Sequence, residues 1–80
     1  MYYVYVLRSL INSKKTYIGY TVNIDHRLAI HNDGQSIHTA KHRPWELLWY
    51  GAFLAEEKAI AFEKYLKIGS GKSLVMKRLI

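Results

Sequence analysis

The sequence predicts an α+β fold in which a small three-stranded antiparallel sheet carries helices, in the order ββαβα plus a short C-terminal helix. Three segments are rich in tyrosine, tryptophan and branched residues, which favour strands. They are residues 2–8, 16–20 and 45–54. Two further segments, 22–33 and 56–68, fit the helical template better than the alternation of a strand.

The length of the chain predicts one domain over residues 1–80, because a stable core usually needs about 50 to 100 residues. Half of the residues are hydrophobic and 22% are charged, which is typical of a globular protein rather than a disordered one. We therefore expect a single compact unit without linkers or repeats.

The first two strands are predicted to form an antiparallel hairpin. Residues 2–8 carry apolar side chains on both sides of the extended chain, so both faces of this strand should be covered. The polar residues 12–15 have the composition of a turn, and residues 16–20 favour a strand again. Tyr5 and Tyr17 should then lie on neighbouring strands, and Gly19 should leave a gap for a ligand or backbone.

The first helix is predicted over residues 22–33, with Thr21 or Asn23 as its N-cap. Gly34 suits the left-handed position that ends many helices. Residues 35–44 have no periodicity and are predicted to form a loop.

The second helix should begin at Glu56 and Glu57, whose charges suit the positive end of the helix dipole. The run Gly69-Ser70-Gly71 should end it, and residues 72–80 are predicted to form a last short basic helix. This run resembles part of a phosphate-binding loop, but Leu66 stands where that motif needs glycine, and the run follows a helix.

Charge and composition narrow the function. Twelve Lys and Arg against six Asp and Glu give a net charge of +6, which favours a polyanionic partner. The basic residues are scattered along the chain rather than gathered on an amphipathic helix, so nucleic acid is favoured over a lipid surface. No cysteine is present, which excludes disulfides and thiolate chemistry. With no signal peptide or membrane anchor in view, we expect a cytoplasmic protein.

Several histidines raise the question of zinc. His38 and His42 have a spacing found in zinc sites, but no thiolate supports them. Solvated loop histidines beside Lys41 and Arg43, in contact with phosphate, are the simpler interpretation.

Arg27 and His31 are more informative, because their i, i+4 spacing places both on one helix face beside Ile24 and Leu28. Cationic groups therefore border the apolar stripe of this helix. The alternative is an arginine whose stem merely covers the core.

Glu63 falls on the shoulder of the apolar stripe that Ala59, Phe62 and Leu66 form on the second helix. A carboxylate there needs a partner. That partner is either Lys67, in an i, i+4 ion pair, or a hard divalent cation, which carboxylate oxygen suits.

The ordered set of these residues resembles a known family. It comprises Tyr3-Val4-Tyr5, Tyr17-Ile18-Gly19, Arg27, His31 and Glu63. This set is similar to the GIY-YIG nuclease domain, and most resembles the small standalone UPF0213 group and the excinuclease nuclease domain. The resemblance covers essentially the whole chain and implies cleavage of DNA phosphodiester bonds with one Mg2+ or Mn2+ ion, with branched or damaged DNA as candidate substrates.

The resemblance also implies a role for each residue. Tyr17 would be the general base for water, and Tyr5 its hydrogen-bonding neighbour. Arg27 would stabilise charge on the phosphate, and His31 would assist Tyr17 or the phosphate. Glu63 would hold the metal ion.

Departures from the family pattern concern positioning and specificity. Tyr3 stands where the family usually has glycine, and Tyr20 where the excinuclease relatives have lysine. No Asn follows Glu63, although several relatives have one. Family nucleases generally take specificity from an attached domain, so we expect either a protein partner that supplies it here or weak nonspecific binding to DNA.

Seven residues are predicted to contact nucleic acid because they are cationic or lie in the basic loops. They are Lys14, Lys15, Lys41, His42, Arg43, Lys67 and Lys72. Two alternatives to a nuclease stay open: a nucleic-acid-binding module without catalysis, and an interaction protein that presents Trp45 and Trp49 to a protein partner.

Overall fold

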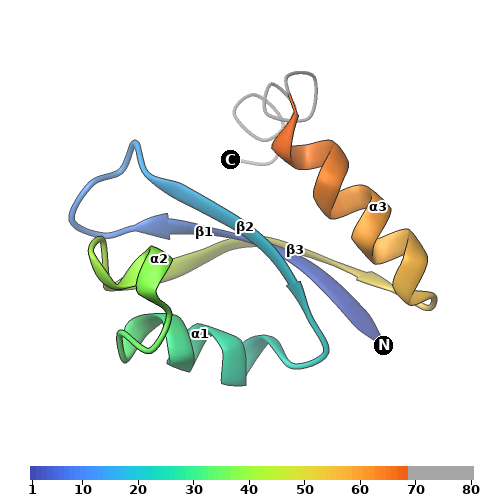
Figure 1. Ribbon diagram of the computed structural model, residues 1–80, viewed down its shortest axis with the longest axis horizontal. Helices are drawn as coiled ribbons and strands as arrows, with labels where there is room; N and C mark the ends of the chain where they lie inside the picture. Colours follow the sequence, from blue (N-terminus) through green and yellow to red (C-terminus); the bar gives the residue numbers. More distant parts are fainter. Residues whose placement is uncertain (69–80) are drawn as a thin grey trace.

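The computed structural model describes residues 1–68, which form three strands and three helices arranged as in Figure 1. The elements are β1 (Tyr2–Ser9), β2 (Thr16–Thr21), α1 (Ile24–Asn32), α2 (Ile37–Ala40), β3 (Trp45–Phe53) and α3 (Glu56–Lys67). The predicted α+β class is therefore confirmed. The predicted helix over 72–80, and the glycines expected to end α3, lie outside the described residues.

The sheet is antiparallel and has the strand order β2-β1-β3, so β1 is its central strand. In this register Tyr5 lies opposite Gly19 on β2 and opposite Tyr50 on β3. Leu7 lies opposite Tyr17, and the pairing of β1 with β3 shifts after Val6. The expected hairpin is confirmed, and this register places Tyr5 and Tyr17 diagonally across two neighbouring strands.

Alternation along β1 divides the core between the two faces of the sheet, with α3 on one side and α1 and α2 on the other (Figure 1). Val4 and Val6 face α3, where Ala59 and Leu66 are fully buried, as the predicted apolar stripe requires. The opposite face carries a second buried cluster. It consists of Tyr5, Leu7 and Trp45, with Tyr17, Leu28 and Leu47 packed against it.

The ends of α1 follow the predicted capping chemistry. Asn23 is the N-cap, and its Oδ1 accepts a hydrogen bond of 3.0 Å from the backbone N–H of His26. Thr21, the other candidate, instead bonds the backbone of Asn23. Gly34 has a φ of 78°, the left-handed conformation expected after the helix. The helix is shorter than predicted, because it begins only after this cap.

The prediction of a loop over 35–44 is wrong in part, because this segment contains α2 (Ile37–Ala40). A helix of four residues is too short to leave a periodic pattern in the sequence. Its position depends on tertiary contacts instead: Thr39 is buried, and its carbonyl accepts a hydrogen bond of 2.8 Å from the indole N–H of Trp45.

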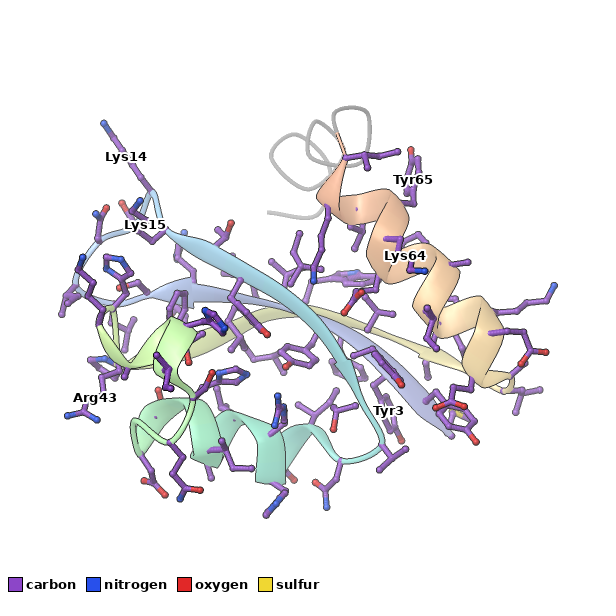
Figure 2. The ribbon with its side chains drawn as sticks, in the orientation of Figure 1. Tyr3, Lys14, Lys15, Arg43, Lys64 and Tyr65 are labelled. Atoms are coloured by element: carbon purple, nitrogen blue, oxygen red, sulfur yellow. The ribbon has the colours of Figure 1, made fainter. Side chains whose placement is uncertain are left out.

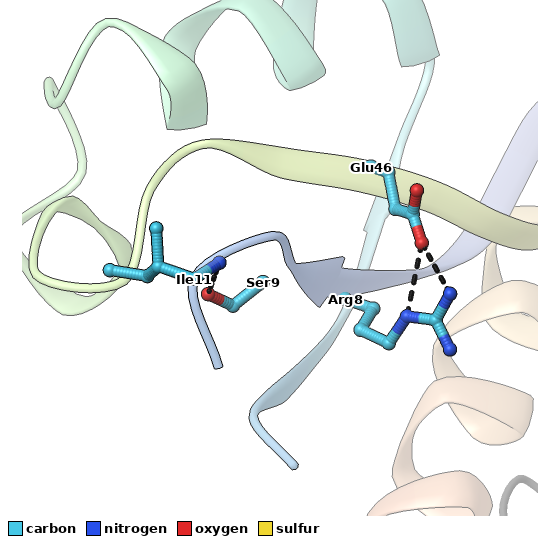
Figure 3. Close-up of polar contacts among 4 residues, drawn as sticks. All are labelled: Arg8, Ser9, Ile11 and Glu46. Carbon is cyan, nitrogen blue, oxygen red and sulfur yellow. Dashed lines mark hydrogen bonds and ion pairs between the residues drawn. The ribbon is translucent and has the colours of Figure 1, made fainter. Parts of the chain in front are cut away.

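Polar contacts at the end of β1 fix the loops beside the sheet (Figure 3). Arg8 donates two hydrogen bonds, of 3.0 and 2.6 Å, to Oε1 of Glu46 on β3. The buried Ser9 hydroxyl accepts from the backbone N–H of Ile11 and donates to the carbonyl of His42. The β1–β2 turn and the α2–β3 connection are therefore both anchored at Ser9.

Candidate active site

Three rings meet on the α1 side of the sheet. The ring centroids of Tyr17 and His31 are 4.8 Å apart, and that of Tyr5 lies 6.0 Å from His31 and 6.3 Å from Tyr17. The expected meeting of the two tyrosines is observed. A Cβ atom added at Gly19 would lie 2.6 Å from the Tyr5 hydroxyl, so the gap at this glycine is occupied by the phenol of Tyr5 itself.

His31 is fully buried and hydrogen-bonded through both ring nitrogens. Its Nε2 lies 3.1 Å from the Tyr5 hydroxyl, and its Nδ1 lies 2.7 Å from Oγ1 of Thr39. Burial, aided by the positive charge of Arg27, lowers the pKa of His31. The imidazole is therefore neutral at pH 7, which corrects the expectation of a cationic group at the edge of the stripe.

Tyr5 is also closed off from solvent, with 2% of its surface exposed. Burial raises the pKa of Tyr5; the nearby guanidinium of Arg27 opposes that effect, and the negative charges of an ionised Tyr17 and of Glu63 add to it. The phenol of Tyr5 therefore stays protonated at neutral pH. The charges of Arg27 and Glu63, from helices on opposite sides of the sheet, therefore both affect the pKa of Tyr5.

Tyr17 differs from Tyr5 because it lines an open pocket at the β2 edge of the sheet. This pocket, here called the lysine pocket, has a volume of about 390 Å³ and is lined by Lys14, Lys15, Thr16, Tyr17, Ile18 and Lys67. Lys14 and Lys15 stand at the tip of the turn between β1 and β2 (Figure 2). Three of the predicted nucleic-acid-binding lysines are thus brought together beside Tyr17.

Glu63 makes the ion pair that its i, i+4 spacing allows, with 3.5 Å between its Oε2 and Nζ of Lys67. Its side chain is 17% exposed. Within residues 1–68, no three His, Asp or Glu side chains gather closely enough to enclose a metal ion. A single carboxylate nonetheless fits Mg2+, which is commonly bound through one or two carboxylates, with water and substrate phosphate completing its shell.

The other predicted phosphate contacts lie elsewhere. Lys41, His42 and Arg43 belong to the connection between α2 and β3, and Figure 2 shows Arg43 at the opposite end of the sheet from Tyr3. Arg43 donates a hydrogen bond of 3.3 Å to the carbonyl of Asp33, and the His42 ring contacts Trp45 edge-on. Lys72 lies outside the described residues.

Two residues of the site were not predicted from the sequence in these roles. The hydroxyl of Thr39 is hydrogen-bonded to Nδ1 of His31, and the indole N–H of Trp45 donates a hydrogen bond to the carbonyl of Thr39.

Tyr20, the residue after the Tyr-Ile-Gly motif, turns away from the ring cluster and donates a hydrogen bond of 3.2 Å to Glu56 of α3. The position after the motif therefore links β2 to α3.

Comparisons with known proteins agree with this arrangement. The family model of the GIY-YIG catalytic domain matches residues 1–77. The UPF0213 protein in ldhD 5'region of Pediococcus acidilactici is 38% identical over 74 residues, which are 89% of this chain and 74% of that protein. A UPF0213 protein of Oceanobacillus iheyensis is 34% identical over 67 residues, which are 82% of this chain and 76% of that protein.

A solved structure supports the fold. The solution NMR structure of a UPF0213 protein from Bacillus halodurans aligns with a TM-score of 0.58 and 28% identity, and the alignment covers 99% of this chain and 87% of that one. No helix within residues 1–68 is both long and apolar enough to cross a membrane. By its motif residues, its fold and its relatives, this chain belongs to the GIY-YIG family of nuclease domains, in the UPF0213 group.

Proposed function

We propose that this protein is a divalent-metal-dependent endonuclease that hydrolyses DNA phosphodiester bonds, with Tyr17 as the base that takes the proton from the attacking water. One observation carries this assignment: Tyr17 lines an open pocket with three lysines, whereas Tyr5 and His31 are buried. A base must reach water, and a phosphate must reach positive charge. Tyr17 is the member of the ring cluster that lines this pocket, which is why we assign the base to Tyr17.

The buried residues have a different role in this proposal. Tyr5, protonated and hydrogen-bonded to a neutral His31, fixes the position of the ring cluster. The positive charge of Arg27 affects the pKa of Tyr5, and its guanidinium would stabilise the charge that develops on the phosphate. Lys14, Lys15 and Lys67 bind neighbouring phosphates.

Glu63 would hold the Mg2+ or Mn2+ ion, which when bound supplies positive charge to the phosphate and to the water. Lys67 neutralises the same carboxylate across 3.5 Å, so Lys67 and a divalent cation compete for Glu63. We therefore expect a metal affinity that rises when Lys67 is replaced by an uncharged residue.

A nucleic-acid-binding module without catalysis is the second candidate. The ion pair between Glu63 and Lys67 favours it, because a carboxylate that is satisfied by lysine has no need of a metal. Both candidates require the lysine pocket, so DNA binding alone does not separate them.

Cleavage assays separate the two candidates. Purified protein is incubated with labelled single-stranded, duplex, flap and junction DNA, in Mg2+, Mn2+ or EDTA. The nuclease assignment expects cleavage of at least one substrate with metal, none with EDTA, and loss of cleavage in Tyr17→Phe. DNA binding without cleavage of any substrate would leave the binding module as the function.

A further inference from the structure

A second pocket lies on the α1 side of the sheet, between the strands and the beginning of α1. It has a volume of about 390 Å³ and is lined by Tyr3, Val22, Asn23, Ile24, Asp25, Leu47 and Tyr50. The rings of Tyr3 and Tyr50 meet edge-on, with centroids 6.0 Å apart, and Tyr50 is 53% exposed. We call it the tyrosine pocket.

The side chains that line the tyrosine pocket do not suit a phosphate. None of its residues is a lysine or arginine, although the chain as a whole has a net charge of +6. Asp25 adds a carboxylate instead. Asn23 uses Oδ1 to cap α1, which leaves its amide hydrogens available to a ligand.

These groups suit a nucleobase. Exposed aromatic rings offer a face on which a base can stack, and base–aromatic stacking tolerates any sequence. Amide donors and a carboxylate acceptor match the hydrogen-bonding edge of a base. An uncharged, planar ligand with a polar edge therefore fits this pocket better than the sugar-phosphate backbone does.

The tyrosine pocket also lies next to the proposed reaction centre. Tyr3 precedes Tyr5 by two residues on the same face of β1, about 7 Å along the strand. Tyr50 is the direct partner of Tyr5 on β3. The lysine pocket lies at the β2 edge, so the two pockets flank the cluster of Tyr5, Tyr17 and His31.

We propose that the tyrosine pocket binds an unpaired nucleobase that flanks the cleaved phosphate, an inference that rests on the proposed nuclease function. A base inside a duplex is stacked on both sides and cannot enter the pocket unless it leaves the helix. The preferred substrate is therefore DNA with an unpaired nucleotide beside the cleavage position, as in a single-stranded arm or flap.

The test is a binding experiment in EDTA, so that it does not depend on cleavage. The DNA is a duplex with a single-stranded arm, and in a series of oligonucleotides one base of the arm at a time is removed to leave an abasic site. Binding of the wild type, Tyr50→Ala and Tyr50→Phe is measured by fluorescence anisotropy. Tyr50 is half exposed, so its replacement should leave the fold intact, which circular dichroism checks.

We expect Tyr50→Ala to weaken binding of the intact arm about tenfold relative to the wild type. Tyr50→Phe should bind as tightly as the wild type, because the phenylalanine ring still stacks. At one abasic position the wild type should lose the same factor and Tyr50→Ala should lose nothing more. Equal affinity of wild type and Tyr50→Ala for the intact arm overturns the inference. So does a loss in Tyr50→Ala that no abasic position reduces.

The two proposals fail in different ways. If the abasic position removes the effect of Tyr50→Ala but the wild type cleaves no DNA in Mg2+ or Mn2+, the base pocket stands and the nuclease assignment fails. If the wild type cleaves DNA but Tyr50→Ala behaves like wild type, the nuclease stands and the base pocket fails. A wild type that binds no DNA overturns both.

Discussion

The lysine pocket and the tyrosine pocket have the same volume, about 390 Å³, but different charged and polar side chains line them. One is lined by three lysines and the other by two tyrosines, an amide and a carboxylate. Contacts to phosphate position a nucleic acid, whereas contacts to bases distinguish one structure from another. The excess of cationic residues therefore indicates a polyanionic partner, while a pocket without lysine or arginine is a candidate site for a group other than phosphate.

The largest effect on cleavage is expected at Glu63, which pairs with Lys67 of the lysine pocket. Glu63→Gln should abolish cleavage and keep DNA binding, because the change removes the anionic metal ligand and preserves side-chain size. Cleavage is measured with Mg2+ or Mn2+, binding by anisotropy in EDTA, and Mn2+ affinity by electron paramagnetic resonance. Glu57→Gln, at an exposed position on the same helix, is the matched control. Full activity and unchanged Mn2+ affinity in Glu63→Gln would assign Glu63 to the ion pair with Lys67 alone.

The second largest effect on cleavage is expected at Tyr17, which lines the lysine pocket, compared with Tyr5, which is buried. Tyr17→Phe should lose about a hundredfold or more in single-turnover cleavage, and Tyr5→Phe should lose less, because only the base must reach water. Burial raises the pKa of Tyr5, so the phenol of Tyr5 should stay protonated at neutral pH. Rates are measured from about pH 6 to 10, across the range in which a free phenol begins to ionise near pH 10. A wild-type rate in folded Tyr17→Phe would remove Tyr17 from the mechanism.

Thr39 is expected to affect both stability and rate. Thr39→Val keeps the shape of the side chain but leaves Nδ1 of the buried His31 without its hydroxyl partner, which should destabilise the fold by about 1–3 kcal/mol. Thr39→Ser restores the hydroxyl and should recover most of that loss. Urea denaturation measures both variants. Equal loss in Thr39→Ser and Thr39→Val would show that packing, rather than the hydrogen bond, matters at this position.

The sequence predicted most of the fold, because the alternation of side chains along residues 2–8 and the apolar stripe of residues 56–67 are strong local patterns. It did not predict α2, which is held by a contact between Thr39 and a histidine eight residues away. His31 was expected to be cationic, because a helical pattern alone does not reveal that its imidazole is fully buried.

The candidate site, like the fold, was predicted only in part from the sequence. The ordered motif residues were found because each carries a distinctive chemistry, and Tyr5, Tyr17 and His31 do come together. The tyrosine pocket was not predicted, because Tyr3 and Tyr50 are far apart in the sequence and meet only through the register of β1 with β3. In the sequence, Tyr3 stood out only because it replaces the glycine that is usual in the family.

Acidification should destabilise the fold through His31. Burial lowers the pKa of His31 in the folded protein, whereas in the unfolded chain it titrates near about 6.5. Below that pH the unfolded state binds the proton more readily, so the free energy of unfolding falls as the pH decreases, by up to about 1.4 kcal/mol per pH unit. Thermal unfolding of wild type and His31→Gln between about pH 5 and 7.5 measures this difference. An equal decrease of the midpoint in both proteins would assign the effect to other groups.

The smallest expected effect distinguishes the two pockets directly, through the salt dependence of DNA binding. Each lysine that neutralises a phosphate releases counterions, so its removal should make the slope of log K against log salt shallower by about 0.9 on duplex DNA, or about 0.7 on a single strand. Lys14→Gln and Lys15→Gln should each change the slope in this way and weaken binding to all sequences alike. Tyr50→Ala should weaken binding with the slope unchanged, because stacking releases no condensed counterions. If Tyr50→Ala changes the slope as much as the lysine variants do, the two pockets do not divide base from phosphate, and the contrast in their linings has another cause.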